Sequence, residues 1–153
     1  MSSETMIRAV RADDFAQWRV LWAGYNAFYG REGQTALPDA VINLTWSRFF
    51  DRYEPMHAFV ADCAGQLLGL AHILFHRSTI DVESTCYLQD LFTSQHARGR
   101  GIGAALIAEV YRYAEQSGTK RVYWHTHETN TTAMRLYGKV AERSGFVVYR
   151  KLF

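Results

Sequence analysis

A glycine-rich segment at residues 98–104 has the residue types that bind a diphosphate. It consists of Arg98, Gly99, Arg100, Gly101, Ile102, Gly103 and Ala104. Glycine leaves backbone N–H groups open to close approach by an anion, and a helix that begins here adds its positive N-terminal end. The two arginines add positive charge. The segment therefore predicts a diphosphate cradle between a strand and an amphipathic helix.

Three classes of ligand could use this cradle. A nucleotide-binding P-loop requires a lysine followed by serine or threonine, and none follows here. A dinucleotide fingerprint fits Gly99, Gly101 and Ala104, but the acid expected about 20 residues later is missing. Coenzyme A is the third class, with its diphosphate on the same loop. A glycine turn that binds no ligand is the alternative to all three.

Apolar spacing predicts the elements that must position this loop. The expected order is β-α-α-β-β-β-α-β-α-β, a mixed α/β (α+β) fold with helices on both faces of a central sheet. One domain over residues 1–153 is expected from the length. Strands are expected at residues 6–11, 57–63, 66–76, 85–93, 121–127 and 146–152, and helices at residues 13–29, 38–50, 101–116 and 130–143.

The overall composition excludes several functional classes. The net charge of +2 is too small to predict a nucleic-acid or membrane-surface partner. Cys63 and Cys86 form no CxxC pair, which is typical of reduced thiols in a reducing compartment. The first residues show no signal peptide and no long apolar run follows. We therefore expect a cytoplasmic protein.

Three segments in order resemble the GNAT superfamily of N-acetyltransferases. They are residues 87–93 (Tyr-Leu-Gln-Asp-Leu-Phe-Thr), the glycine loop, and Asn130 with Leu136 and Tyr137. The run from Tyr123 to Asn130 is similar to the branch that acetylates polyamines and histones, and residues 87–90 are similar to spermidine/spermine acetyltransferases. The resemblance implies a GNAT-like sheet and transfer of an acetyl group from acetyl-CoA, the co-substrate, to a primary amine by direct attack.

The resemblance also assigns roles along the chain. It implies a bulged strand ending near Phe92 that splays from its parallel neighbour, so that backbone groups there bind the pantetheine arm and one N–H stabilises the oxyanion. Asn130 becomes a polar contact to that arm, Ala133 lets the cofactor pass, and Tyr137 becomes the acid that protonates the CoA thiolate. The residues expected to bind acetyl-CoA are Leu91, Phe92, Thr93, Arg98, Gly99, Arg100, Gly101, Ile102, Gly103, Ala104, Asn130 and Ala133.

The group that deprotonates the amine is not evident from the sequence. Gln89 stands where the spermidine-type enzymes carry glutamate, and an amide cannot accept a proton. Asp90 is adjacent, but strand alternation points it to the other face unless a bulge redirects it. We name Asp90 as the candidate base, directly or through water. His125 or Glu128 could serve instead, and Asp90 could equally be a structural carboxylate.

The acceptor is expected to be a small-molecule amine. Acidic residues in the loops of the acceptor side favour a cationic, polyamine-like amine, although they could be ordinary surface charge. They are Glu32, Asp51, Glu54, Asp81 and Glu83. The alternatives are a protein lysine acetyltransferase, a CoA-binding regulatory module without turnover, and a nucleotide-binding protein. A homodimer is expected because relatives are often dimers.

Two pairs of histidines are interpreted as non-catalytic. His125 and His127 share a strand face with only Glu128 as a third ligand, so no metal is expected. His72 and His76 share a face of another strand, and we expect them to be half-buried or at its rim.

Overall fold

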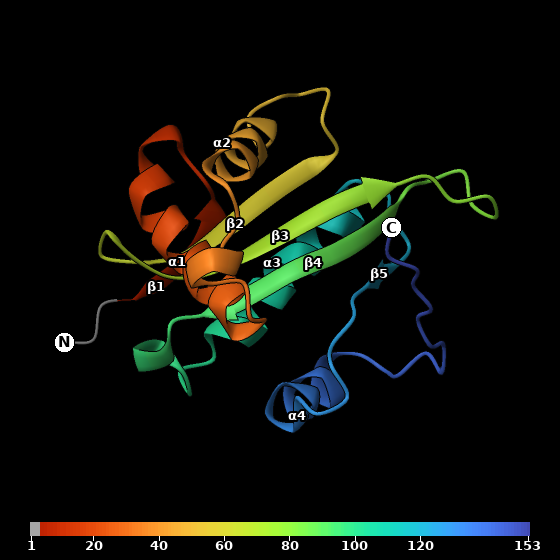
Figure 1. Ribbon diagram of the computed structural model, residues 1–153. Coiled ribbons are helices and arrows are strands. Elements are labelled where there is room, and N and C mark those ends of the chain that lie inside the picture. The colour runs from red at the N-terminus through yellow and green to blue at the C-terminus, as the bar shows by residue number, and fades with distance from the viewer. Residues whose placement is uncertain (1–3) are drawn as a thin grey trace.

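The computed structural model describes residues 4–153 and places five strands in one mixed sheet (Figure 1). The strands lie in sequence order, antiparallel up to β4, and β5 then pairs with β4 in parallel. They are β1 (Thr5–Ala9), β2 (Met56–Cys63), β3 (Gln66–His76), β4 (Thr85–Thr93) and β5 (Val122–Tyr123). A right-handed crossover helix suits such a parallel pair, and α3 (Ile102–Gln116) joins β4 to β5.

Helices cover both faces of this sheet. Trp18 and Leu21 of α1 pack with Leu70 of β3 on one face, and Leu106 and Val110 of α3 pack on the other. Trp18 is fully buried, as is Leu106. Helix α1 spans Phe15–Phe28, and the other two helices are α2 (Asp39–Arg48) and α4 (Thr131–Val140). Three 3-10 turns lie at Ala12–Asp14, Gly33–Thr35 and Gln95–Ala97. The expected mixed α/β fold is confirmed.

A β-bulge interrupts β4 in its middle. His72 of β3 pairs with Asp90, but the next residue of β3 pairs with Leu88, so Gln89 is the extra residue. Leu88 and Leu91 therefore both contact the α3 core, whereas Asp90 contacts α1. The bulge thus redirects Asp90, as the sequence analysis allowed, from the α3 face to the α1 face.

Strands β4 and β5 diverge soon after they meet. They pair only at Cys86 with Val122 and at Tyr87 with Tyr123. Beyond Tyr87, the edge of β4 that faces the C-terminal part of the chain has no strand partner among residues 4–153. The expected bulge and splay are both confirmed.

Two expectations about the C-terminal part are wrong. The strand expected at residues 121–127 is limited to β5, and the strand expected at residues 146–152 does not form. Every residue from Ala141 to Phe153 is exposed. A strand needs the edge of a neighbour for its backbone hydrogen bonds, and this segment lies along no strand of residues 4–153. We call residues 141–153 the C-terminal arm.

The helices lack the features of a membrane-spanning segment. No helix within residues 4–153 combines the length and the apolar character needed to span a membrane. The expectation that the chain begins without a signal peptide falls partly on residues 1–3, which lie outside the described range.

Candidate active site

The glycine loop has the backbone conformation of an anion cradle. Gly99 and Gly101 adopt φ angles of +77° and +76°, and a Cβ at either position would meet nothing within 4 Å. Gly101 caps α3, so the N–H groups of Ile102, Gly103 and Ala104 precede the first intrahelical hydrogen bond. Partial positive charge gathers at such a helix end. The loop therefore fits a diphosphate in shape and in charge.

The two arginines of the loop are exposed beside this cradle. Arg98 Nε donates a long hydrogen bond of 3.4 Å to the Thr93 carbonyl, and Arg100 extends toward Cys63. Ile102, by contrast, is 4% exposed and packs in the α3 core. The arginines can reach an anion with their side chains, whereas Ile102 can offer only its backbone.

The end of β4 leads directly to the loop. Leu91, Phe92 and Thr93 pair with β3 along one edge, and their other edge faces the gap that opens beyond Tyr87. Phe92 packs so closely on α1 that a Cβ at Gly24 would lie 2.9 Å from its ring. Helix α1 therefore holds this strand end in place from behind.

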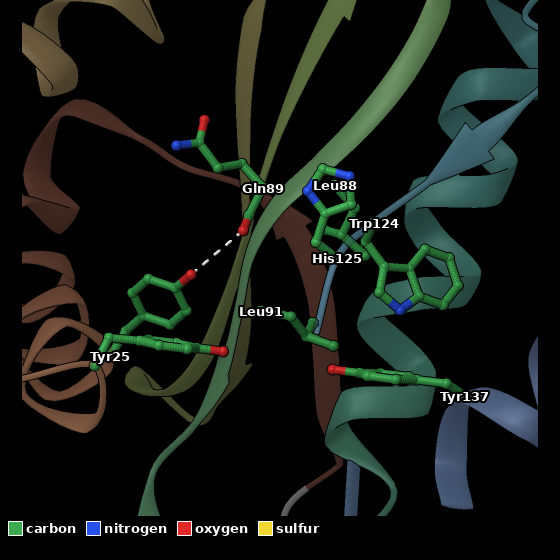
Figure 2. A pocket seen from close by; sticks show the side chains of 8 residues that line it. Tyr25, Leu88, Gln89, Leu91, Trp124, His125 and Tyr137 are labelled. Atoms are coloured by element: carbon green, nitrogen blue, oxygen red, sulfur yellow. Dashed lines mark hydrogen bonds between the residues drawn. The ribbon is translucent and has the colours of Figure 1, made fainter. Parts of the chain in front are cut away.

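A narrow pocket lies in the gap beside β4 (Figure 2). Its volume is about 20 Å³, close to the space of one water molecule. One wall comes from α1 and β4, and the other comes from residues 124–137. The lining residues are Tyr25, Tyr29, Leu88, Gln89, Leu91, Trp124, His125 and Tyr137. The expected acid, Tyr137, and the strand backbone therefore face the same space.

Tyr137 projects into this pocket from α4. Its ring lies 5.3 Å from that of Trp124, and Figure 2 shows its hydroxyl at the end nearest Leu91. That hydroxyl has no hydrogen-bond partner among residues 4–153. Burial, followed by the nearby Tyr29, raises the pKa of Tyr137 above its ordinary value of 10.0. The phenol is thus protonated at neutral pH and available as a donor.

Asn130 and Ala133 lie at the start of α4, outside the lining of the pocket. The Asn130 Oδ1 accepts a hydrogen bond of 3.4 Å from the Ala133 N–H and so caps the helix. The Nδ2 group of Asn130 then stays available for a cofactor. The sequence analysis named this residue for binding, and the cap agrees with its position at the start of the helix expected at residues 130–143.

Asp90 belongs to a buried cluster behind the pocket. The carboxylate is 7% exposed, and its Oδ2 lies 2.8 Å from His72 Nδ1 and 3.2 Å from Trp22 Nε1. Trp18 Nε1 in turn lies 2.8 Å from His72 Nε2. The expectation of a half-buried or rim position is wrong for His72, which is 2% exposed. Its position within the apolar run of β3 was the signal in the sequence that could have predicted this burial.

Tyr25 connects this cluster to the pocket, and the sequence analysis did not single it out as a site residue. Its hydroxyl donates a hydrogen bond of 3.3 Å to the Gln89 carbonyl at the bulge. Burial, and after it the charge of the nearby Asp90 carboxylate, raises the pKa of Tyr25. Tyr25 therefore lines the pocket and is bonded to the residue that precedes the buried acid.

The other candidate groups are divided between the pocket and the surface. His125 lines the pocket and lies 3.3 Å from the Tyr87 hydroxyl through its Nδ1, whereas Glu128 is exposed and does not line it. Glu54 and Glu83 pair with Arg48 and Lys120. No carboxylate is among the pocket-lining residues. Within residues 4–153, no cluster of three His, Cys, Asp or Glu could hold a metal ion.

The chain is similar to known proteins in family, in sequence and in fold. The model of the acetyltransferase (GNAT) family matches residues 17–141. The D-amino-acid N-acetyltransferase HPA3 of Saccharomyces cerevisiae is 33% identical over 99% of this chain and 92% of its own length. The uncharacterized N-acetyltransferase YhfO of Bacillus subtilis is 27% identical over 94% of each chain. The aminoglycoside N-acetyltransferase AAC(6')-Iy, solved with CoA, shares the fold with a TM-score of 0.83 at 19% identity, over 99% of this chain and 97% of its own.

Proposed function

Since the chain belongs to the acetyltransferase (GNAT) family, and is thus an acyl-CoA-dependent N-acetyltransferase, we propose that it acetylates the primary amine of a small molecule by direct attack. One observation carries this proposal. The glycine cradle, the free edge of β4 and the Tyr137 hydroxyl all border the gap between β4 and α4. A thioester beside β4, with its diphosphate on the loop, would place its sulfur near Tyr137.

The residues of the chain divide the chemistry as follows. A backbone N–H of Leu91, Phe92 or Thr93 holds the negative charge that develops on the thioester oxygen. Tyr137 donates its proton to the departing thiolate, which a phenol can do for a thiol that titrates near about 8.5. Asp90 takes the proton that the attacking ammonium must lose. Acetyl-CoA supplies the acyl group as co-substrate, and the other loop residues bind it.

The charges around the pocket bear on the identity of the acceptor. A polycation would find no carboxylate among the lining residues. Arg31, instead, lies 6.0 Å from the Tyr25 ring and 5.7 Å from the Tyr29 ring, and it has no ion pair among residues 4–153. Its Nε donates to Asn26 Oδ1 at 2.8 Å, and the other N–H groups of this guanidinium suit an acceptor that carries a carboxylate. We therefore propose an amino acid, in agreement with the name of the yeast relative.

A panel of amines tests both the reaction and the acceptor class. Thiol release from acetyl-CoA would be measured with D- and L-amino acids, spermidine, an aminoglycoside and a lysine peptide. Amino acids should give the highest kcat/KM, and Arg31→Gln should raise their KM at least tenfold while leaving the KM of a carboxylate-free amine within about twofold. No release with any amine would support the CoA-binding module instead. A preference for spermidine would contradict the amino-acid acceptor and would indicate a polyamine instead.

We also propose that the protein is a homodimer built through the C-terminal arm. The arm exposes six large apolar side chains, each at least 66% accessible: Phe146, Val147, Val148, Tyr149, Leu152 and Phe153. A run of this kind rarely stays in water. Strand β5 has β4 on one side only, so its free edge can accept a strand. The arm of a second copy is the occupant that fits, because its length and apolar residues suit a strand.

Light scattering tests this assembly. The intact chain should have the mass of two copies, and a chain that stops after Gly145 should have the mass of one. A double substitution of Val148 and Leu152 by lysine should give the same result without shortening the chain. If the intact chain were a monomer, or if the truncated chain were still a dimer, the arm would not form the interface.

Two further expectations stay predictions. The protein should be found in the cytoplasmic fraction of the cell. The steps above use only side-chain and backbone groups of the chain, so a chelator should leave the rate of acetyl transfer unchanged, and a loss of activity that added metal restores would contradict this.

A further inference from the structure

Asp90 has no direct access to the pocket in which an amine would bind. It is not among the lining residues, and α1 covers it. An acid in this position can accept a proton from a substrate only through an intermediate group. The inference below rests on the proposed function, because it concerns how Asp90 would serve as the base of that reaction.

The hydrogen bonds of the cluster define where its protons lie. An indole N–H can only donate, so His72 Nε2 must accept from Trp18 Nε1 at 2.8 Å. The proton of the neutral imidazole is therefore on Nδ1, and it is donated to Asp90 Oδ2 at 2.8 Å. A second proton on His72 would face the Trp18 N–H. His72 thus fixes the carboxylate but cannot carry a proton onward.

The same bonds leave one carboxylate oxygen for another partner. His72 and Trp22 both donate to Oδ2, so Oδ1 has no donor from either. Tyr25 is the neighbour that lines the pocket, and its hydroxyl is bonded to the backbone carbonyl of Gln89, the residue directly before Asp90. Its bond to the Gln89 carbonyl at 3.3 Å is long, and a hydroxyl can rotate from one acceptor to another.

We propose that Tyr25 is a catalytic relay that passes the proton of the acceptor ammonium to Asp90 Oδ1, with His72 as a positioning residue. An N–H bond of the ammonium breaks as an O–H bond forms on the phenol oxygen. The original phenol O–H breaks at the same time as an O–H forms on Oδ1. Tyr25 ends neutral, Asp90 ends protonated, and the amine lone pair is free to attack. The proton leaves later by the reverse route to solvent.

The surroundings of the relay suit this role. Burial and the adjacent carboxylate raise the pKa of Tyr25, so the phenol keeps the proton that it must hand on. Phe49, which directly follows α2, covers His72 with its ring centre 4.9 Å away and brings no charge. The titratable and charged groups along the path and in the pocket are Asp90, His72, Tyr25, Tyr29, Arg31, Tyr87, His125 and Tyr137.

Paired phenol variants test the relay. Tyr25→Phe keeps the ring and removes the hydroxyl, and it should lower kcat/KM about a hundredfold, the usual size of a lost acid–base group. Tyr29→Phe removes a hydroxyl from the same pocket that makes no described bond to Gln89 or Asp90, and it should lower kcat/KM by no more than about threefold. Equal losses in the two variants would overturn the relay.

A double variant separates the relay from the proposed base. If both act in one path, Tyr25→Phe should cost little more once Asp90→Asn is present. Loss of rate in Asp90→Asn with full rate in Tyr25→Phe would overturn the relay alone. Full rate in Asp90→Asn would show that Asp90 is not the base and would overturn the relay with it. The proposed transferase would still stand, because the variant would still acetylate the amine. Unchanged CoA affinity and a cooperative thermal unfolding transition would show that the variants are folded.

Rescue by a second variant tests His72. His72→Phe removes the N–H that holds Asp90 Oδ2, so it should lower kcat at least tenfold and leave the KM of the amine within about twofold. His72→Asn carries an N–H near the position of Nδ1 and should restore most of kcat. A merely structural His72 would lower stability in both variants without this loss of kcat, and that result would overturn its positioning role.

Discussion

Asp90 and Tyr137 lie on opposite sides of the same gap, and the two walls that carry them are anchored in different ways. The α1 wall holds Asp90 through two N–H donors in a core where Trp18 is fully buried. The α4 wall carries Tyr137 on a helix with no buried residue. Its anchors are a ring contact with Trp124, the approach of Leu136 to Gly103, and a hydrogen bond from Tyr111.

This difference predicts how substitutions will act. A preorganised group in a packed core links catalysis to stability, because the same contacts provide both. A group on a lightly anchored helix can lose catalysis while the fold stays intact. Changes on the α1 wall should therefore lower the free energy of unfolding, and changes on the α4 wall should mainly lower kcat.

The largest effect is expected in the loop that both walls flank. Gly101→Val introduces a Cβ into the cradle and a residue that disfavours φ of +76°. The affinity for CoA, measured by calorimetry, should fall more than about a hundredfold. Gly118→Val is the matched control, because Gly118 follows the other end of α3 with φ of +81°. Similar CoA affinity in the two variants would contradict the cradle.

The next largest effect concerns the acid itself. Tyr137→Phe should lower kcat about a hundredfold, as loss of a general acid does. The variant should bind CoA with nearly the affinity of the parent, because the ring and its contact with Trp124 are kept. Thermal unfolding should also be unchanged. An unaltered kcat would remove Tyr137 as the acid.

A substitution in the α1 wall should instead show up in stability. Trp18→Phe removes the N–H that His72 accepts and leaves a gap beside Phe49. The free energy of unfolding should fall by about 2–3 kcal/mol, measured by denaturant titration. A loss below about 0.5 kcal/mol would show that this wall is no better anchored than its counterpart.

A smaller effect is expected from the anchor of α4. Tyr111→Phe removes the hydrogen bond of 2.8 Å to the Val140 carbonyl, worth about 1 kcal/mol. Because this bond helps to place Tyr137, kcat should fall a few-fold while unfolding changes little. A larger loss of stability than in Trp18→Phe would reverse the comparison.

The smallest effect is a predicted lack of pH dependence. The acid must be protonated, and burial raises the pKa of Tyr137 above 10.0. Its deprotonation therefore removes activity only at still higher pH. From about pH 8 to about pH 9.5, kcat should stay constant, and a decline with a midpoint in that range would point to another acid.

The sequence predicted the fold well where the pattern is local. Apolar runs located β2, β3 and β4, and the helical period located α1 and α3. The strand predicted at residues 146–152 was wrong because this segment has the composition of a strand, whereas strand formation depends on the free edge of another strand. The strand predicted at residues 121–127 was too long for the same reason, since β4 turns away from β5 after Tyr87.

In the candidate site, the backbone conformation of the glycine loop could be predicted, whereas the contacts around Asp90 could not. Glycine patterns report backbone conformation directly, so Gly99 and Gly101 could be found from their spacing. The cluster of Trp18, His72 and Asp90 joins an N-terminal helix to two strands, and Trp18 and His72 are 54 residues apart in the sequence. No local pattern encodes such a contact.

The bulge at Gln89 shows that the path of a strand can matter as much as the identity of its residues. If the same residues formed a regular strand from Leu88 onward, alternation would turn Asp90 away from the two tryptophans and toward the layer formed by α3. The sequence of the strand would be unchanged, yet the acid would be separated from its histidine. An ungapped alignment with a strand that has no bulge at this point would therefore equate carboxylates that face opposite layers of the protein.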